Sequence, residues 1–144
     1  LALRYANVYG PRQDPHGEAG VVAIFCGQML AGKPVTIVGD GRQTRDYVYV
    51  GDVARASLAA LDSASGALNI STGIETDVNQ LHRVLAHAAG IEATAIHVAA
   101  RAGEQRRSVI TPARAARELD WRPVVELEEG LRRTFQYFKQ RLGA

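Results

Sequence analysis

The stretch GDGRQTRDYVYVGDVARA, residues 39–56, carries most of the information about the fold. It opens with a turn of small residues and continues through Arg45 into the alternating run 46–50. Such alternation predicts a half-buried strand, and Asp52 is a favourable N-cap for a helix directly after it. The run PVTIVG just before the turn also predicts a short strand. Residues 35–50 are therefore expected to form a hairpin.

Outside this stretch, strands and helices alternate along the chain. Further strands are expected at residues 1–9, 67–72 and 95–100, and further helices are expected to begin near Val21, Asp77, Thr111-Pro112 and Glu128. Asp77 with Gln80 resembles a capping box, and Gly90 suits the residue after a helix. At Thr111-Pro112 we expect the threonine to cap the helix and the proline to take its first position. The order of elements predicts a mixed α/β chain.

The composition excludes several classes of protein. The 144 residues, 47% of them apolar and 22% charged, suffice for one domain with a core. A net charge of +2 is too small to indicate nucleic-acid binding, and no run of about 18 apolar residues predicts a membrane span. The single cysteine, Cys26, excludes an internal disulfide and favours a cytoplasmic location. Because the chain begins at Leu1 instead of Met, we expect a piece of a longer protein.

Metal binding and nucleophilic catalysis find little support. The histidines are at positions 16, 82, 87 and 97, and His82 and His87 are five residues apart, so they do not share a helix face. Cys26 lies beside the apolar face of its predicted helix with no histidine near it in sequence. A buried, inert thiol is therefore expected in place of a nucleophile. No metal site is predicted.

Two arginines stand at ends of predicted strands. Arg45 begins one strand, and Arg101 follows the run 95–100 in the glycine-containing segment RAGEQRRS. Ligand contacts in α/β folds concentrate at strand ends, and each charge-assisted hydrogen bond contributes about 1.5–3 kcal/mol. The two arginines could bracket a pyrophosphate. The alternative is that each forms a surface ion pair with one of the 15 acidic residues.

Five segments in order resemble a known family. They are RYANVYGP (4–11), GDGRQTRDYVYVGDVARA (39–56), ALNISTG (67–73), RAGE (101–104) and ARELDWRP (116–123). Together they resemble the C-terminal part of extended short-chain dehydrogenases, the NAD-dependent epimerase/dehydratase family, and most of all its UDP-glucose 4-epimerases. The resemblance implies an α/β fold: the C-terminal substrate-binding portion of an extended Rossmann-type enzyme, with some strands belonging to a Rossmann sheet not completed here. Residues 1–144 would be the nucleotide-sugar-binding portion, and the N-terminal NAD-binding half would be absent from this sequence.

The resemblance also implies roles for individual residues. Asn7 and Arg45 would contact the diphosphate of a nucleotide sugar, with Arg101 as the partner of Arg45. Glu104, where the family often has Asp, would reach the ribose hydroxyls. The remaining implied contacts are Thr36, Ile37 and Val38 at the base, Gly20 and Val21 in a substrate loop, Ser108 where epimerases often carry Tyr, and Ala6 beside the nicotinamide end of NAD.

The catalytic parts of the family are not in this sequence. Family members bind NAD through a glycine-rich loop and use a Tyr-x-x-x-Lys pair for acid–base chemistry. The residues four positions before Lys33 and Lys139, the two lysines, are Met29 and Phe135. We therefore assign no catalytic residue and expect the chain to be inactive alone.

The function implied by the resemblance is binding of the nucleotide sugar for an NAD-dependent 4-epimerase that interconverts UDP-glucose and UDP-galactose. One alternative is another epimerase, dehydratase or decarboxylase of the same family. The other is a truncated, non-catalytic nucleotide-sugar-binding or interaction protein. The partner is a nucleotide sugar, with no nucleic acid and no membrane. Because strands 1–8 and 67–72 contain apolar residues expected to be buried, among them Leu1, Leu68 and Ile70, we also expect a homo-oligomer or association through open strands.

Overall fold

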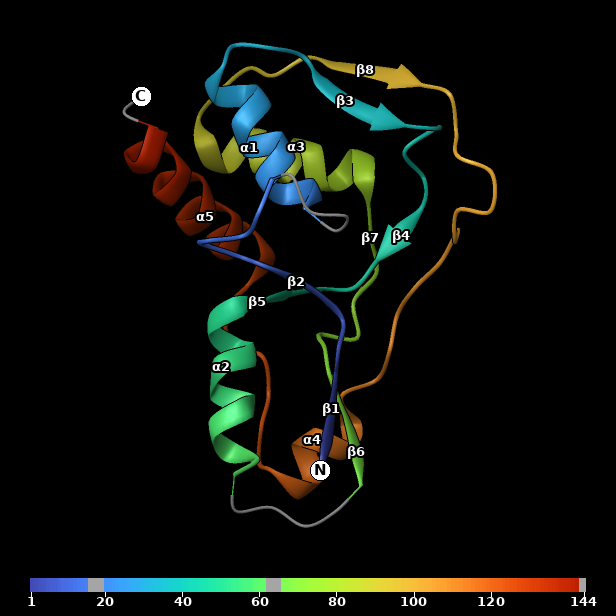
Figure 1. Ribbon diagram of the computed structural model, residues 1–144, viewed down its shortest axis with the longest axis vertical. Coiled ribbons are helices and arrows are strands. Elements are labelled where there is room, and N and C mark those ends of the chain that lie inside the picture. The colour runs from blue at the N-terminus through green and yellow to red at the C-terminus, as the bar shows by residue number, and fades with distance from the viewer. Residues whose placement is uncertain (16–19, 62–65, 143–144) are drawn as a thin grey trace.

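A computed structural model describes residues 1–15, 20–61 and 66–142 and shows two lobes joined by short strand pairs (Figure 1). His16 lies outside the described residues. The upper lobe in Figure 1 contains α1 (Val21–Leu30), α3 (Val78–Ala89), α5 (Leu127–Leu142), β3 (Val35–Val38) and β8 (Ala95–Val98). The lower lobe contains β1 (Ala2–Tyr5), β6 (Ala67–Ile70), α2 (Val50–Ala59) and α4 (Ala113–Glu118). Between them lie β2 (Asn7–Tyr9), β5 (Tyr47–Tyr49), β4 (Thr44–Arg45) and β7 (Thr76–Asp77).

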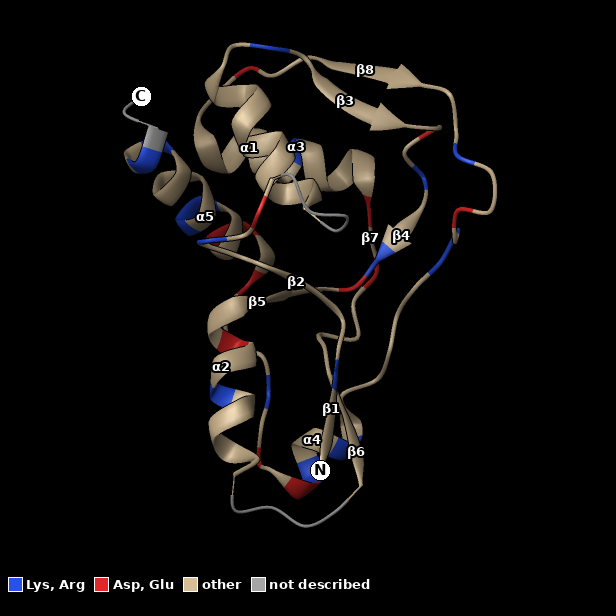
Figure 2. Ribbon diagram, in the orientation of Figure 1, with Lys and Arg blue, Asp and Glu red and all other residues tan. Residues whose placement is uncertain are grey.

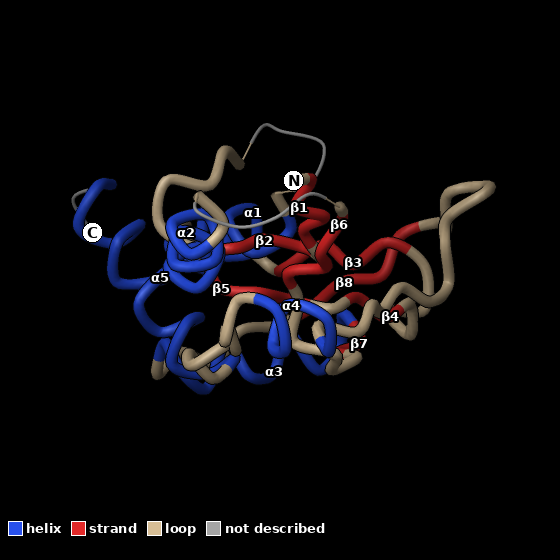
Figure 3. The backbone as a smooth tube through the Cα atoms, turned by 90° about the horizontal axis from the view of Figure 1, so that it is seen from below, coloured by secondary structure: helices blue, strands red, loops and turns tan. Residues whose placement is uncertain are grey.

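The strands form four separate pairs, of which β1–β6, β2–β5 and β3–β8 are parallel and β4–β7 is antiparallel. Seen from below, the strands gather in the centre of the molecule with α2 and α5 to one side (Figure 3). The hairpin predicted for residues 35–50 is therefore wrong. β3 pairs with β8, placing Val35 opposite Ala95, and β5 pairs with β2. Local alternation identifies a strand, but a parallel partner lies far away in sequence and is not specified by it. None of the described helices is long and apolar enough to cross a membrane.

The segment predicted as one strand at residues 1–9 changes partner in its middle. β1 pairs with β6, and β2 pairs with β5. The change falls at Ala6, whose N–H donates to the carbonyl of Ile70 at 3.0 Å, while the next N–H, that of Asn7, donates to the carbonyl of Asp46 at 2.8 Å. Two neighbouring residues thus connect the lower lobe to the strands between the lobes.

Each lobe has its own buried cluster. Large apolar side chains of the upper lobe, such as Phe25, Leu85 and Leu131, are at most 2% exposed. In the lower lobe, Trp121 is also 2% exposed and belongs to the second buried cluster. Burial of each such side chain stabilises the fold by about 1.5–3 kcal/mol. Cys26 is fully buried, as predicted, and burial raises the pKa of its thiol to about 12. Leu68 and Ile70 are buried, as expected, whereas Leu1 is 45% exposed.

Asp52 does not cap α2, contrary to the prediction. The helix begins at Val50, so Asp52 lies within its first turn, and the residue is 1% exposed. One carboxylate oxygen accepts the backbone N–H groups of Val124 and Val125 at 3.1 and 3.0 Å, and the other accepts the Arg55 guanidinium at 2.7 Å. Asp52 therefore fastens the segment before α5 to α2, through partners that its local sequence does not contain.

The predicted boundaries of α3 are confirmed, and that of α4 differs by one position. The N–H of Gln80 donates to the Asp77 carboxylate at 2.6 Å, and Gly90 ends α3 with a φ of 66°. At α4, Pro112 precedes the first helical residue, Ala113, instead of occupying that place. The hydroxyl oxygen of Thr111 still accepts the Ala113 N–H, at 3.3 Å.

Two helical glycines provide a matched test of packing. A Cβ at Gly130 would collide with the hydroxyl of Tyr9, which donates to the Leu127 carbonyl at 3.3 Å. A Cβ at Gly27 would meet no atom within 4 Å apart from those of its chain neighbours and the nearby backbone of its own helix. We expect Gly130→Ala to lower the free energy of unfolding by about 1–3 kcal/mol. Gly27→Ala should raise it by about 0.5–1 kcal/mol through helix propensity. Urea denaturation measures both, and shifts of the same sign would contradict this account of Gly130.

The outer edge of β1 gives a second prediction. Among the described residues β1 pairs only with β6, and Tyr5 is 47% exposed. The N–H groups of Ala2 and Ala6 face β6, so by strand alternation the N–H of Tyr5 faces away from it. We expect concentration-dependent self-association through this edge, measured by light scattering. Tyr5→Pro should reduce it, because proline removes the outward N–H, whereas Tyr5→Ala should retain it. A monomer at every concentration would contradict the prediction.

Candidate functional site

A cavity of about 390 Å³, here called the arginine cavity, lies where α1, β3 and β4 meet the loop after β8. The positions at which the resemblance implied substrate contacts come together there, with the exception of Ser108. They are Asn7, Gly20, Val21, Thr36, Ile37, Val38, Arg45, Arg101 and Glu104. Because these residues come from segments spread over most of the chain, only the fold brings them together.

Further lining residues were not predicted from the sequence. They are Ile24, Phe25, Gln43, Tyr47 and Val78. Tyr47 is 6% exposed, and burial raises the pKa of its phenol to about 12, so it stays neutral at ordinary pH. The apolar members belong to the helix stripes of α1 and α3, where the sequence indicates only core packing. The cavity therefore combines an apolar wall with a charged rim.

The guanidinium of Arg45 is held in place by backbone carbonyls. Its Nη1 donates to the carbonyls of Thr44 and Gln105 at 2.7 and 2.8 Å. Its Nη2 lies 3.9 Å from a carboxylate oxygen of Glu104, beyond hydrogen-bond distance. Both N–H groups of Nη1 are thus engaged, which leaves those of Nε and Nη2 for a ligand. The side chain is 20% exposed, so this donor set lies at the cavity and is partly shielded from water.

Arg101 and Glu104 are brought together by a tight turn. The N–H of Glu104 donates to the carbonyl of Arg101 at 3.4 Å. Gly103, at the third position of the turn, has a φ of 78°, the left-handed conformation that a type II turn requires there. The side chains at the two ends of this turn both line the arginine cavity.

Two arginines that follow the turn fasten its loop to the rest of the site. Arg106 makes a bidentate pair with Asp40 at 3.0 and 3.1 Å, and its guanidinium lowers the pKa of that carboxyl to about 2. Arg107 donates from Nε to both carboxylate oxygens of Glu75, at 2.7 and 2.8 Å, and from Nη2 to Oε1. Glu75 also accepts the hydroxyl of Thr44 at 2.8 Å. In Figure 2, blue and red segments lie along the loop after β8 and along the chain between β3 and β4. The pairs hold the loop beside β4.

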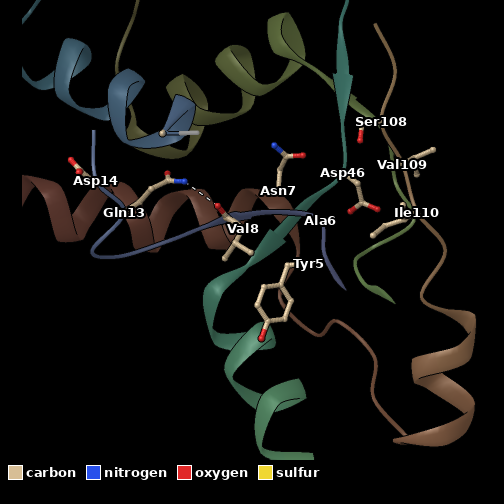
Figure 4. Close-up of a pocket in the computed structure, with 11 residues that line it drawn as sticks. Tyr5, Ala6, Asn7, Val8, Gln13, Asp14, Asp46, Ser108, Val109 and Ile110 are labelled. Carbon is tan, nitrogen blue, oxygen red and sulfur yellow. Dashed lines mark hydrogen bonds between the residues drawn. The ribbon is translucent and has the colours of Figure 1, made fainter. Parts of the chain in front are cut away.

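A second cavity of about 820 Å³, here called the strand-end cavity, adjoins the first (Figure 4). It contains the two remaining predicted positions, Ala6 and Ser108, and shares Asn7 and Gly20 with the arginine cavity. Figure 4 shows Asn7 between Gln13 and Asp46, next to Ala6, the residue that separates β1 from β2. The strand-end cavity lies at the carboxyl ends of β1 and β6, where α/β folds commonly bind ligands.

Asp46 lines the strand-end cavity and was not predicted as part of the site. It is 1% exposed, and its carboxylate accepts the N–H and hydroxyl of Thr72 at 2.9 and 2.7 Å and the N–H of Gly73 at 2.9 Å. Its backbone carbonyl accepts the N–H of Asn7. The signal in the sequence is a carboxylate placed inside an alternating strand, which calls for buried donors.

Within the described part of the chain, no group of three or more His, Cys, Asp or Glu residues could hold a metal ion. His82 packs edge-on against Phe25, and burial lowers the pKa of its imidazole. His87 lies 2.8 Å from the Glu128 carboxylate, and His97 lies 2.8 Å from the Gly39 carbonyl. These contacts place the three rings in three different surroundings.

Residues 1–71 match the model of the NAD dependent epimerase/dehydratase family. The chain is 47% identical to a putative UDP-glucose 4-epimerase of Methanocaldococcus jannaschii, covering 95% of this chain and 45% of that protein. It is 31% identical to UDP-glucuronic acid decarboxylase 1 of Xenopus tropicalis, covering 96% of this chain and 33% of the relative.

Solved structures of UDP-glucose 4-epimerases are similar to this chain over a comparable share of their length. A UDP-glucose 4-epimerase with UDP-glucose from Thermotoga maritima is 50% identical, with a TM-score of 0.93, and the match covers 97% of this chain and 46% of that one. A Thermus thermophilus UDP-glucose 4-epimerase in complex with NAD is 46% identical, with a TM-score of 0.89 over 95% of this chain and 45% of the other.

The fold is thus a portion of a Rossmann-type epimerase/dehydratase fold, with an α/β arrangement of short parallel strand pairs. The chain belongs to the NAD-dependent epimerase/dehydratase family and is similar to its UDP-glucose 4-epimerases. It spans slightly less than half the length of these epimerases.

Proposed function

We propose that this chain is the nucleotide-sugar-binding portion of an NAD-dependent 4-epimerase acting on UDP-glucose and UDP-galactose. The observation that carries the proposal is the arginine cavity, which gathers two arginines, an asparagine and an apolar wall from distant parts of the chain. Residues 1–144 would form the substrate-binding portion, and the NAD-binding half would lie in sequence beyond this chain. Similarity to epimerases of both bacterial and archaeal origin supports this assignment.

The chemistry of the cavity suits a nucleotide diphosphate. Arg45 offers a pre-oriented pair of donor groups, and guanidinium groups bind phosphate oxygens by forked, charge-assisted hydrogen bonds. Arg101 adds a second positive charge on the same rim. Thr36, Ile37 and Val38 form a strand beside the apolar side chain of Phe25, which suits a flat base. The sugar would then extend past Asn7 into the strand-end cavity.

The strand-end cavity also suits one end of NAD. Ala6 has a small side chain at the carboxyl ends of β1 and β6, so it leaves the wall open next to Asn7. When bound, NAD would supply a hydride acceptor for the sugar. This chain would contribute the wall at Ala6 and would orient the substrate through Asn7, Arg45 and Arg101.

A second candidate function is a decarboxylase of the same family, favoured by the similarity to a UDP-glucuronic acid decarboxylase. Both candidates share the nucleotide diphosphate. They differ at the sugar, near Ser108, whose small side chain lines the strand-end cavity. Binding of UDP-glucose against UDP-glucuronic acid separates them.

The proposed diphosphate contacts are tested by calorimetric titration of the chain with UDP-glucose. Arg45→Ala and Arg101→Ala should each weaken binding about 10- to 100-fold, the loss of roughly 1.5–3 kcal/mol from one charge-assisted contact. Arg83→Ala is the matched control, because Arg83 is an exposed arginine on α3. Arg55→Ala is unsuitable as a control, since Arg55 contacts the buried Asp52. Equal effects at Arg83 and Arg45 would contradict the assignment.

Catalysis is expected to need more than this chain. The sequence contains neither a Tyr-x-x-x-Lys pair nor a G-x-G-x-x-G loop, so no side chain here is assigned to take the sugar proton as hydride leaves. The purified 144-residue chain, supplied with NAD, should bind UDP-galactose without converting it. Measurable turnover to UDP-glucose in a coupled assay would overturn this expectation.

A further inference from the structure

We propose that Gln43 is a positioning residue that holds the carboxylate of Glu104 so that the arginine cavity selects a ligand with a ribose diol. Gln43 follows the turn after β3 and lines the arginine cavity beside both Arg45 and Glu104. The inference rests on the proposed function and deepens it, because it names the residue that positions the carboxylate expected to meet the ribose.

The amide of Gln43 is fixed at two points. The residue is 5% exposed, and its Nε2 donates to the Val38 carbonyl at 2.9 Å and to Oε1 of Glu104 at 3.4 Å. An amide nitrogen carries two N–H groups, so one serves each acceptor. Because Val38 belongs to a strand, the first bond anchors the side chain to a rigid element, and the second extends that rigidity to a loop residue.

Both contacts of the Glu104 carboxylate fall on the same oxygen. Oε1 accepts from Gln43 and lies 3.9 Å from Nη2 of Arg45. Within the described residues no hydrogen bond or ion pair reaches Oε2. The side chain of Glu104 is 28% exposed and lines the cavity, so a ligand in the cavity can reach this side chain.

The chemistry of a carboxylate determines what it can bind beside two arginines. A phosphate brought to Arg45 and Arg101 would be repelled by Glu104, so Glu104 must meet a neutral donor group of the same ligand. An ionised carboxylate only accepts hydrogen bonds, and adjacent ribose hydroxyls supply two donors. A 2′-deoxyribose supplies one. A carboxylate held at a fixed angle therefore distinguishes the two sugars better than a freely rotating one.

The experiment titrates the chain with UDP and with 2′-deoxy-UDP, which share the base and the diphosphate. We expect the wild-type chain to prefer UDP about 10-fold, the value of one hydrogen bond to a charged group. Gln43→Ala and Glu104→Ala should each reduce the preference to about 2-fold, and the double variant should match Glu104→Ala alone because the two residues act through one contact. Gln43→Met keeps the buried volume and should behave like Gln43→Ala. Gln136→Ala, an exposed glutamine on α5, is the control.

Each other outcome counts against the proposal. If the losses at Gln43 and Glu104 multiply in the double variant, Gln43 contacts the ligand itself and does not act through Glu104. An unchanged preference for UDP in Gln43→Met would likewise overturn it. Failure of the wild-type chain to bind either nucleotide would overturn the proposed function and the ribose assignment with it.

A measurement without ligand separates these two failures. In the proton–nitrogen NMR spectrum of the free chain, Glu104→Gln should shift the side-chain amide pair of Gln43 and leave that of Gln136 in place. If the amide signals of Gln43 shift but the chain binds no nucleotide, Gln43 holds Glu104 and only the proposed function is wrong. An unshifted pair would show that Gln43 does not hold Glu104 at all.

Discussion

The arrangement of the whole molecule depends on the buried carboxylate of Asp46. It accepts three hydrogen bonds from Thr72 and Gly73, directly after β6, while its backbone carbonyl accepts the N–H of Asn7. Through this one residue, the segment between β4 and β5 is joined to β2 and to the residues directly after β6. Burial of a carboxylate without such donors would strongly destabilise the fold. Asp46 can therefore be buried only because Thr72 and Gly73 donate to it. Asp46 also lies between β4 and β5, directly between Arg45 and Tyr47, which both line the arginine cavity.

The cavities follow from this junction. The N-terminal strand leaves β6 at Ala6 and joins β5 at Asn7, so Asn7 stands where the two lobes meet. Both cavities share it. On the far side, the loop after β8 is fastened by Arg106 and Arg107 to acidic residues of two other segments. The site is thus built from loops whose positions are fixed by buried or bidentate contacts. Such contacts hold binding residues on loops in a defined geometry.

The sequence predicted most elements but not their pairing. Helix periodicity and capping residues such as Asp77 and Gly90 are local signals, and the structure confirms them. Strand partners are not local. β3 pairs with β8, which lies far away in the sequence, so the expected hairpin was wrong. The same reason explains Asp52, whose role depends on Val124 and Val125 far along the chain. Likewise, motifs located the candidate binding residues, whereas nothing in the sequence around Gln43 indicates its contact with Glu104, which is 61 residues away.

The structure also bears on the alternatives that the sequence left open for Arg45. Several arginines elsewhere on the surface lie in short ion pairs, as Arg114 does with Glu118 at 2.7 Å and Arg133 with Glu129 at 2.6 Å. Arg45 differs, since it is 20% exposed, bonded to carbonyls and no closer than 3.9 Å to its only carboxylate neighbour among the described residues. A cation shielded from water without a tight counterion is costly for the free protein. An anionic ligand would relieve that cost, so the geometry of Arg45 supports the proposed diphosphate contact more than it supports a surface ion pair.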